Sequence, residues 1–172
     1  MTTIRTTPAR PISFLRRATV AIGLALGLTV TALPAQEAAA GTLTYTVAGV
    51  TVTAPNWGAK VAVWTALNQR GDPYSWGGSG PSSFDCSGLT SYSWRAAGIT
   101  IPRTSSAQST YGRYVTKSSL RAGDLVFFYS PVSHVAMYIG NGYIVHAPYS
   151  GQVVRTAKLA YMPSYAGARR PY

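Results

Sequence analysis

The stretch Phe84–Gly98, FDCSGLTSYSWRAAG, decides how this chain is expected to fold and where its chemistry is expected to lie. It predicts a helix that begins at Asp85 or Cys86, runs to about Ala97 and ends at Gly98, which can adopt the left-handed conformation. Cys86 is the only cysteine of the 172-residue chain. A thiol in the first helical turn faces unpaired backbone N–H groups and the positive end of the helix dipole, which favours the nucleophilic thiolate. Cys86 is therefore the candidate nucleophile.

The carboxylate that precedes the cysteine works against this effect. A negative charge at Asp85 beside a thiolate would raise the pKa of the Cys86 thiol. Two interpretations remain open at this stage. Either the Asp85 side chain turns away to cap the helix, or it waits for a cationic group on a substrate.

The elements on both sides of this helix indicate an α+β fold. Residues 42–53 alternate apolar residues with threonine and predict strands or an extended lead-in, and Asn56 caps a helix that reaches Gln69. Residues 72–83 are rich in Gly, Pro and Ser and predict a loop, and Thr104 caps a further short helix. Beyond Gly123 the pattern predicts strands at residues 125–129, 134–139, 143–147 and 152–155. Helices followed by antiparallel strands are typical of α+β domains.

The chain contains two histidines, His134 and His146, which flank the turn signal Gly140–Gly142. A two-residue loop would place the two imidazoles on opposite faces of the hairpin. A three-residue loop over Gly140–Gly142, or a compensating bulge nearby, would make them diagonal neighbours on one face. We predict that loop or that bulge. His134 would then act as the general base for Cys86, and His146 would orient its ring.

Each of these residues also has an ordinary structural interpretation. A free cysteine is often a small buried apolar residue, and a histidine in a strand is often a satisfied core or surface residue. Their combination on the predicted elements favours catalysis. Zinc would accept Cys86, His134 and His146 as ligands, but the sequence lacks a close-spaced ligand pair. No metal and no cofactor are therefore expected.

The first forty residues have the pattern of an export signal. Four arginines precede an uncharged run over residues 18–33, and Ala38, Ala39 and Ala40 supply a small-residue cleavage site. The apolar run is short of the ~20 residues that span hydrocarbon, so no stable membrane anchor is expected. The predicted organisation is a signal peptide over residues 1–40, a short lead-in over 41–54 and a catalytic domain over 55–172. The protein is expected to be secreted or held in the cell envelope.

Positive charge dominates the part of the chain that follows the predicted signal. Eleven Lys and Arg residues stand there against three Asp residues, a formal charge of +8. Such a surface is expected to attract anionic polymers or membrane surfaces in a salt-sensitive way. A nucleic-acid partner is not expected, because the basic residues are scattered singly and the chain is predicted to be exported.

Six motifs, in order, resemble those of the NlpC/P60 cysteine peptidases. They are Pro73-Tyr74-Ser75-Trp76-Gly77-Gly78, Phe84-Asp85-Cys86-Ser87-Gly88-Leu89, Ile101-Pro102-Arg103-Thr104-Ser105, Ala122-Gly123-Asp124-Leu125-Val126-Phe127-Phe128, His134-Val135-Ala136-Met137-Tyr138-Ile139-Gly140 and Val145-His146-Ala147-Pro148. The resemblance covers roughly residue 55 to the C-terminus. It implies a papain-like α+β fold in which the nucleophile helix packs on an antiparallel sheet.

The resemblance also implies an activity. Such enzymes act on peptidoglycan, usually on the stem-peptide bond between D-glutamate, through its γ-carboxyl, and diaminopimelate or lysine. By position Cys86 matches the family nucleophile, His134 its base and His146 its third polar residue. The intermediate would be a thioester on Cys86.

Five further residues are candidates for the substrate-binding region. Tyr74 matches a tyrosine near the nucleophile, whose hydroxyl would help the Cys86 N–H hold the oxyanion. Asp85 and Ser87 match residues that recognise a free amino terminus in a subset of the family. Trp76 is expected in the core or in the cleft wall, and Arg103 is expected to hold a loop or to contact substrate carboxylates.

Two other functions remain open from the sequence. The same fold and triad could serve an N-acetylmuramoyl-L-alanine amidase or an acyltransferase. A catalytically idle, cationic wall-binding protein is the third possibility. Peptidoglycan is the expected partner in all these cases, and the chain is expected to be a monomer.

Overall fold

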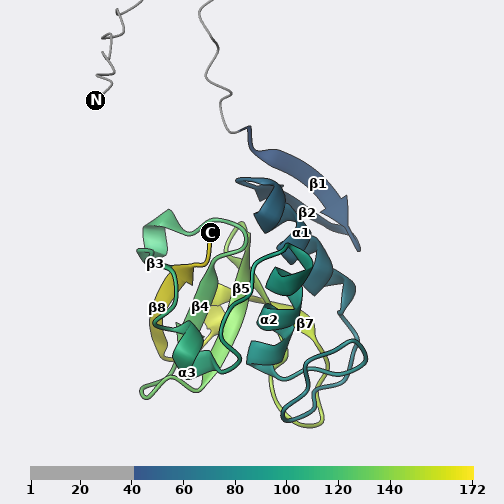
Figure 1. The fold of residues 1–172 in the computed structure, drawn as a ribbon, viewed down its shortest axis with the longest axis vertical. Helices are drawn as coiled ribbons and strands as arrows, with labels where there is room; N and C mark the ends of the chain where they lie inside the picture. The colour runs from purple at the N-terminus through teal and green to yellow at the C-terminus, as the bar shows by residue number, and fades with distance from the viewer. Residues whose placement is uncertain (1–40) are drawn as a thin grey trace, which may run out of the picture. The chain divides into compact units, whose positions relative to one another are not determined.

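The described residues, 41–172 of a computed structural model, begin with a β-hairpin (Figure 1). Strand β1 (Leu43–Val47) pairs antiparallel with β2 (Val50–Ala54), and Ala48 and Gly49 make the turn with φ of 47° and 76°. The alternating pattern of the lead-in therefore produces two strands, which expose their threonines. The signal peptide predicted for residues 1–40 lies outside the described residues.

Each predicted helix is confirmed, together with its capping residue. Helix α1 (Trp57–Asn68) is capped by Asn56, α2 (Cys86–Ala96) by Asp85, and α3 (Ser105–Gln108) by Thr104. Gly98 follows α2 with φ of 80°, the left-handed conformation expected of it. Among residues 41–172, no helix is both long and apolar enough to cross a lipid bilayer.

Six strands form one antiparallel sheet in the order β3-β8-β4-β5-β6-β7. Their bounds are β3 Arg113–Tyr114, β4 Leu125–Phe128, β5 His134–Gly140, β6 Tyr143–His146, β7 Arg155–Lys158 and β8 Tyr165–Arg170. Two 3-10 turns, η1 (Lys117–Ser119) and η2 (Leu159–Tyr161), connect them. The expected strands β4, β5 and β6 are confirmed.

The last predicted strand is displaced, and two strands were not predicted. Residues 152–154 are irregular except for an isolated bridge from Val153 to Pro73, and the ladder with β6 starts only at Arg155. The segment β8, with the sequence YAGARR, lacks the alternation of apolar and polar residues that marks a strand. The segment β3 has two residues, too few to give a pattern.

The hairpin between β5 and β6 contains the bulge and not the three-residue loop. Asn141 and Gly142 form a two-residue turn with φ of 52° and 77°, and Gly140 pairs with Tyr143. The register shifts between Tyr138 and Gly140, so that Ile139 is an extra residue in β5. The loop prediction is therefore wrong, whereas the alternative prediction of a compensating bulge is confirmed.

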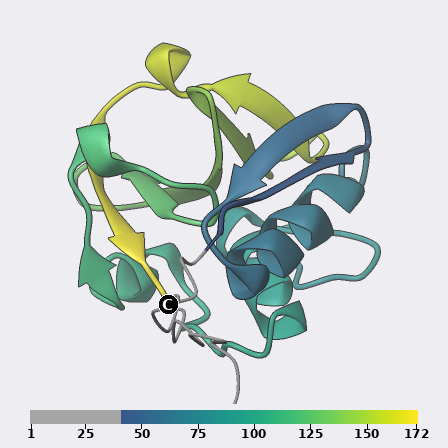
Figure 2. The same ribbon diagram turned by 90° about the horizontal axis from the view of Figure 1, so that it is seen from above.

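The sheet has a buried apolar layer on each face. Helix α2 packs against β5 on the face that contains Val135 and Met137, while Ala136 and Ile144 belong to the layer on the other face. Helix α1 lies against both α2 and the β1–β2 hairpin (Figure 2). This packing fixes the N-terminal end of α2 against the start of β5, where Cys86 meets the first residues of that strand.

Candidate active site

Cys86 is the first residue of α2 and is half-buried. Backbone N–H groups of Val135, Ser87 and Cys86 itself lie against its sulfur. The Cys86 turn packs tightly on the preceding loop, because a Cβ added at Gly88 would collide with the carbonyl oxygen of Gly78. The thiol is thus fixed between the helix start and β5.

Burial contributes most to the protonation state of Cys86, together with the helix start and Asp85. Burial raises the pKa of the Cys86 thiol, and the negative charge of Asp85 raises it further, while the N–H groups of Val135 and Ser87 lower it. The helix start does favour the thiolate, but desolvation outweighs it. In the free protein the thiol therefore keeps its proton.

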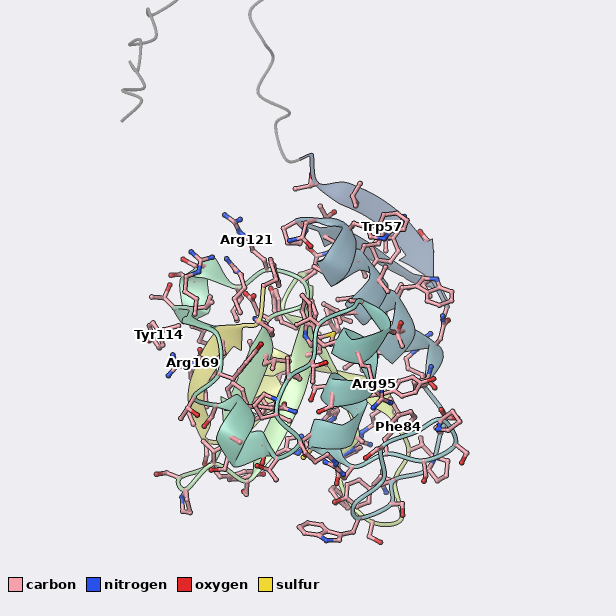
Figure 3. All side chains as sticks on the ribbon, viewed as in Figure 1. Trp57, Phe84, Arg95, Tyr114, Arg121 and Arg169 are labelled. Carbon is pink, nitrogen blue, oxygen red and sulfur yellow. The ribbon has the colours of Figure 1, made fainter. Side chains whose placement is uncertain are left out.

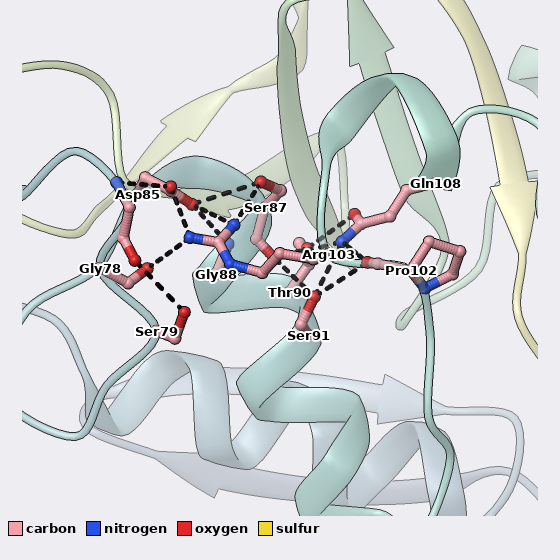
Figure 4. A network of polar contacts seen from close by, with 11 residues as sticks. Gly78, Ser79, Asp85, Ser87, Gly88, Thr90, Ser91, Pro102, Arg103 and Gln108 are labelled. Atoms are coloured by element: carbon pink, nitrogen blue, oxygen red, sulfur yellow. Dashed lines mark hydrogen bonds and ion pairs between the residues drawn. The ribbon is translucent and has the colours of Figure 1, made fainter.

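Asp85 caps α2 and is held by an arginine of this chain (Figure 4). Its Oδ1 accepts a hydrogen bond from the Gly88 N–H at 2.6 Å, and its Oδ2 accepts one from the Gly77 N–H at 3.0 Å. The Arg103 guanidinium donates to both carboxylate oxygens, at 2.9 Å and 2.7 Å. Burial opposes ionisation, yet these hydrogen bonds and the charge of Arg103 hold the pKa of Asp85 below its usual range. The capping interpretation of Asp85 is confirmed.

Arg103 joins three segments that surround the nucleophile. Besides Asp85, it donates to Ser87 Oγ at 2.9 Å and to the Gly78 carbonyl at 3.3 Å. Its side chain is 40% exposed and that of Asp85 11% exposed, so one side of the guanidinium faces solvent. Arg103 therefore holds the loop that contains Gly78, which is one of its two predicted roles. An incoming ammonium group would compete with it for Asp85.

A buried amide supports this arrangement from the other side of α2. Gln108 Nε2 donates to the carbonyls of Ser87 and Pro102, at 3.1 Å and 2.8 Å, and its Oε1 accepts from Thr90 Oγ1 at 2.8 Å. These bonds tie α3 to the first turns of α2 (Figure 4). The segment that contains Arg103 is consequently fixed against α2 through Pro102 and Gln108.

The two histidines contact each other directly. His134 Nε2 and His146 Nδ1 lie 2.9 Å apart, and both side chains are buried. Burial lowers the pKa of His134 to about 4. Burial, then His134 and Arg155, lower the pKa of His146 to about 3. Both rings are therefore neutral at physiological pH.

A pocket of about 390 Å³ contains both the thiol and the first imidazole. The predicted substrate-binding residues also line it: Tyr74, Trp76, Asp85, Ser87 and Arg103. Trp76 is 90% exposed, which assigns it to the cleft wall and excludes it from the core. A hollow of similar size, about 440 Å³, lies between the β1–β2 hairpin and the β5–β6 turn, but its lining has no nucleophile and no histidine.

A second hollow adjoins the histidines, and the sequence did not reveal it. It measures about 350 Å³ and is lined by Tyr129, Ser133, His134, His146, Pro148, Tyr149, Arg155, Met162 and Pro163. Arg155 enters it because the ladder of β6 and β7 pairs Arg155 with His146. The register could not be read in advance, since β7 itself was predicted three residues too early.

Within residues 41–172, no three side chains of His, Cys, Asp or Glu come together in a way that could hold a metal ion. A second carboxylate, that of Asp124, is buried in an ion pair with Arg170 at 2.7 Å. Its Oδ2 also accepts a hydrogen bond from the Arg121 N–H at 2.7 Å. Asp124 therefore has a structural role, away from the thiol.

Comparison with known families agrees with this geometry. Residues 71–170, more than half of the chain, match the model of the NlpC/P60 family. The chain belongs to the NlpC/P60 family. That match includes Cys86, both histidines and the Arg103 segment, and it begins after α1.

Solved NlpC/P60 structures confirm the α+β fold. A family protein from Bacillus cereus is 42% identical, with a TM-score of 0.62 over 65% of this chain and 39% of that chain. The peptidoglycan hydrolase RipB of Mycobacterium tuberculosis is 30% identical, with a TM-score of 0.62 over 66% of this chain and 64% of that chain.

Curated sequence relatives share the same region. A protein of Corynebacterium glutamicum named probable endopeptidase is 48% identical over 110 residues, which are 64% of this chain and 52% of that protein. The chain thus spans about half the length of the curated corynebacterial relatives that it matches.

Proposed function

We propose that this NlpC/P60 protein is a cysteine endopeptidase that hydrolyses peptidoglycan stem peptides, at the bond between the γ-carboxyl of D-glutamate and diaminopimelate or lysine. One observation carries the proposal: Cys86 and His134 line one pocket, and His134 in turn contacts His146 at 2.9 Å. Nucleophile, base and orienting group in this order are the requirement for acyl transfer. The named activities of relatives, a probable endopeptidase and a peptidoglycan hydrolase, support the choice of substrate.

The contact between the two histidines decides which ring nitrogen of His134 acts as the base. His134 Nε2 is engaged by His146, so Nδ1 is the nitrogen left to take the Cys86 proton. As the sulfur attacks the peptide carbonyl, Nδ1 accepts that proton and then donates it to the departing amine, which leaves a thioester on Cys86. A water molecule, deprotonated by His134, attacks the thioester. Its oxygen forms the new carboxyl group, and the proton returns through His134 to the Cys86 sulfur.

A neutral thiol beside a neutral imidazole suits this sequence of steps. Because burial raises the pKa of Cys86 and lowers that of His134, proton transfer is coupled to attack and is not completed beforehand. The developing oxyanion would be held by the Cys86 N–H and the Tyr74 hydroxyl. Burial and the nearby Cys86 and Asp85 raise the pKa of Tyr74, so that its hydroxyl remains a donor.

Location and surface charge complete the proposal. Residues 1–40 would direct export, and the cationic surface would then hold the enzyme near anionic wall polymers. Asp85 and Asp124 are already paired with arginines, so most of the remaining cations face solvent without an internal carboxylate. Arg121 and Arg169 lie on the side of the domain formed by β3 and β8 (Figure 3).

Mass spectrometry of the soluble fragments released from purified peptidoglycan tests this function. Fragments that end in D-glutamate should appear with the unmodified protein and should be absent with the Cys86→Ala variant. Fragments separated at the sugar–peptide junction would instead establish an amidase. Binding without release by either protein would establish the idle wall-binding function.

A further inference from the structure

Arg155 stands directly opposite His146 in the sheet. The antiparallel ladder of β6 and β7 pairs His146 with Arg155, which places both side chains on the same face with their Cβ atoms about 5 Å apart. His134 contacts His146 on that face. Arg155 is thus the fourth side chain in a row that consists of Cys86, His134, His146 and Arg155.

Two adjoining hollows share His134, together with Ser133 and Pro148. The pocket of about 390 Å³ contains Cys86 and His134, whereas the hollow of about 350 Å³ contains His134, His146 and Arg155 but not Cys86. The acyl part of a substrate must remain at the sulfur, and the departing amine must lie beside the histidine that protonates it. The residue that supplies the amine therefore extends past His134 into the hollow that contains Arg155.

The guanidinium of Arg155 is available to a ligand. It is exposed, and it donates a hydrogen bond to a neutral side chain, Gln152 Oε1, at 3.2 Å. The ion pairs formed within residues 41–172 join Asp85 to Arg103 and Asp124 to Arg170. Arg155 forms none, although its charge is near enough to His146 to lower the pKa of that ring.

We propose that Arg155 binds a carboxylate on the amine-side residue of the substrate, and that the enzyme therefore prefers a leaving residue with a free carboxylate over the same residue with a carboxamide. This inference rests on the proposed function, since it assigns the leaving side from the chemistry of His134. Arginine suits the task because its planar fork can donate two parallel hydrogen bonds to one carboxylate. The exposed residues Tyr129 and Tyr149 line the same hollow, and their hydroxyls offer further donors.

Carboxylate binding at this position would also assist the reaction. The positive charge of Arg155 disfavours protonation of the histidine pair, which must carry a proton between attack and departure of the amine. A bound carboxylate offsets that charge without contacting the sulfur. The bound substrate would thereby make protonation of His134 more favourable during the reaction.

Two synthetic peptides test the inference. Both contain D-glutamate joined through its γ-carboxyl to diaminopimelate. The two peptides differ in one carboxyl group of the diaminopimelate, which is free in one peptide and a carboxamide in the other. The unmodified protein should cleave the carboxylate form with a kcat/KM about tenfold higher, chiefly through KM, which corresponds to roughly 1.4 kcal/mol. Arg155→Gln should bring this ratio close to one, and Arg155→Lys should leave an intermediate ratio.

Lys158→Gln is the matched control. Lys158 is an exposed cation of the same strand, but it pairs with Tyr143 and does not line the hollow. This variant should keep the ratio of the unmodified protein. An equal kcat/KM for the two peptides in the unmodified protein would overturn the inference, as would a ratio that Arg155→Gln leaves unchanged.

Binding of the same peptides to the Cys86→Ala variant separates this inference from the proposed function. A preference for the carboxylate that disappears in the Cys86→Ala, Arg155→Gln double variant supports the subsite even if the unmodified protein cleaves neither peptide. Cleavage of both peptides, with equal binding of both by Cys86→Ala, would support the endopeptidase and reject the subsite.

Discussion

His134 Nε2 and His146 Nδ1 lie 2.9 Å apart because β5 contains one residue more than its partner strand requires. The two-residue turn Asn141–Gly142 alone would place the imidazoles on opposite faces of the hairpin. The extra residue Ile139 reverses the alternation between the turn and His134. A catalytic face is thus assembled by a local irregularity in an otherwise regular sheet.

Replacing His146 should impair catalysis more than folding. In His146→Ala the His134 ring loses its hydrogen-bond partner, and we expect kcat to fall by about 100-fold or more. His146→Asn retains an amide oxygen that can accept from His134 Nε2–H and should recover part of that loss. Steady-state kinetics on a stem peptide, with the thermal midpoint measured in parallel, checks this prediction. Equal kcat for the two variants would contradict the orienting role.

Substitutions on the two sides of the Asp85–Arg103 pair should change thiol reactivity in opposite directions. Asp85→Asn retains an oxygen for the Gly88 N–H but removes the charge that raises the pKa of Cys86. Alkylation by iodoacetamide at pH 7 should therefore become several-fold faster. Arg103→Gln leaves the Asp85 charge uncompensated, so alkylation should become slower.

Arg95→Gln serves as the control for those alkylation rates. Arg95 lies in the last turn of α2, at the opposite end from the thiol, and its variant should react like the unmodified protein. If Asp85→Asn slowed alkylation, the carboxylate would not be the group that raises the pKa of Cys86.

The free energy of unfolding should decrease as the pH falls from about 6.5 to about 4. Burial lowers the pKa of His134 from 6.5 to about 4, so in this window the unfolded chain binds a proton that the folded protein excludes. Stability is thus fully present above pH 6.5 and is lost progressively below it. The shift of His134 alone corresponds to about 3 kcal/mol. Urea unfolding at several pH values should give this slope, and His134→Gln should reduce it without removing it, because His146, whose pKa is lowered to about 3, contributes in the same direction.

Gly88→Ala should destabilise the protein through steric collision alone. The new Cβ would meet the Gly78 carbonyl oxygen, and this collision would separate the Gly77–Gly78 loop from α2. We expect a loss of about 3 kcal/mol in the free energy of unfolding, together with lower activity. Gly98→Ala meets no atom within 4 Å but has φ of 80°, and should cost only about 1 kcal/mol. Comparable losses for both variants would show that the loop can adjust.

Features encoded by neighbouring residues were predictable. Asn56, Asp85 and Thr104 act as helix caps where the sequence indicated them, because a cap depends on a side chain and an N–H group three residues later. Strand β8 escaped prediction, since its central Gly and Ala residues obtain their conformation from pairing with β4 and β3. The same reason explains the displaced β7, whose position depends on its register with β6.

The sequence by itself determined the α+β class, the three caps, the candidate triad and the need for one extra residue in the β5–β6 hairpin. Those properties follow from short-range periodicity and from residue chemistry. Only the tertiary structure decided that Arg103 forms an ion pair with Asp85, that burial keeps Cys86 protonated and that Arg155 pairs with His146 across two strands. Desolvation and strand register depend on segments far apart in the chain, and no local pattern of residues contains them.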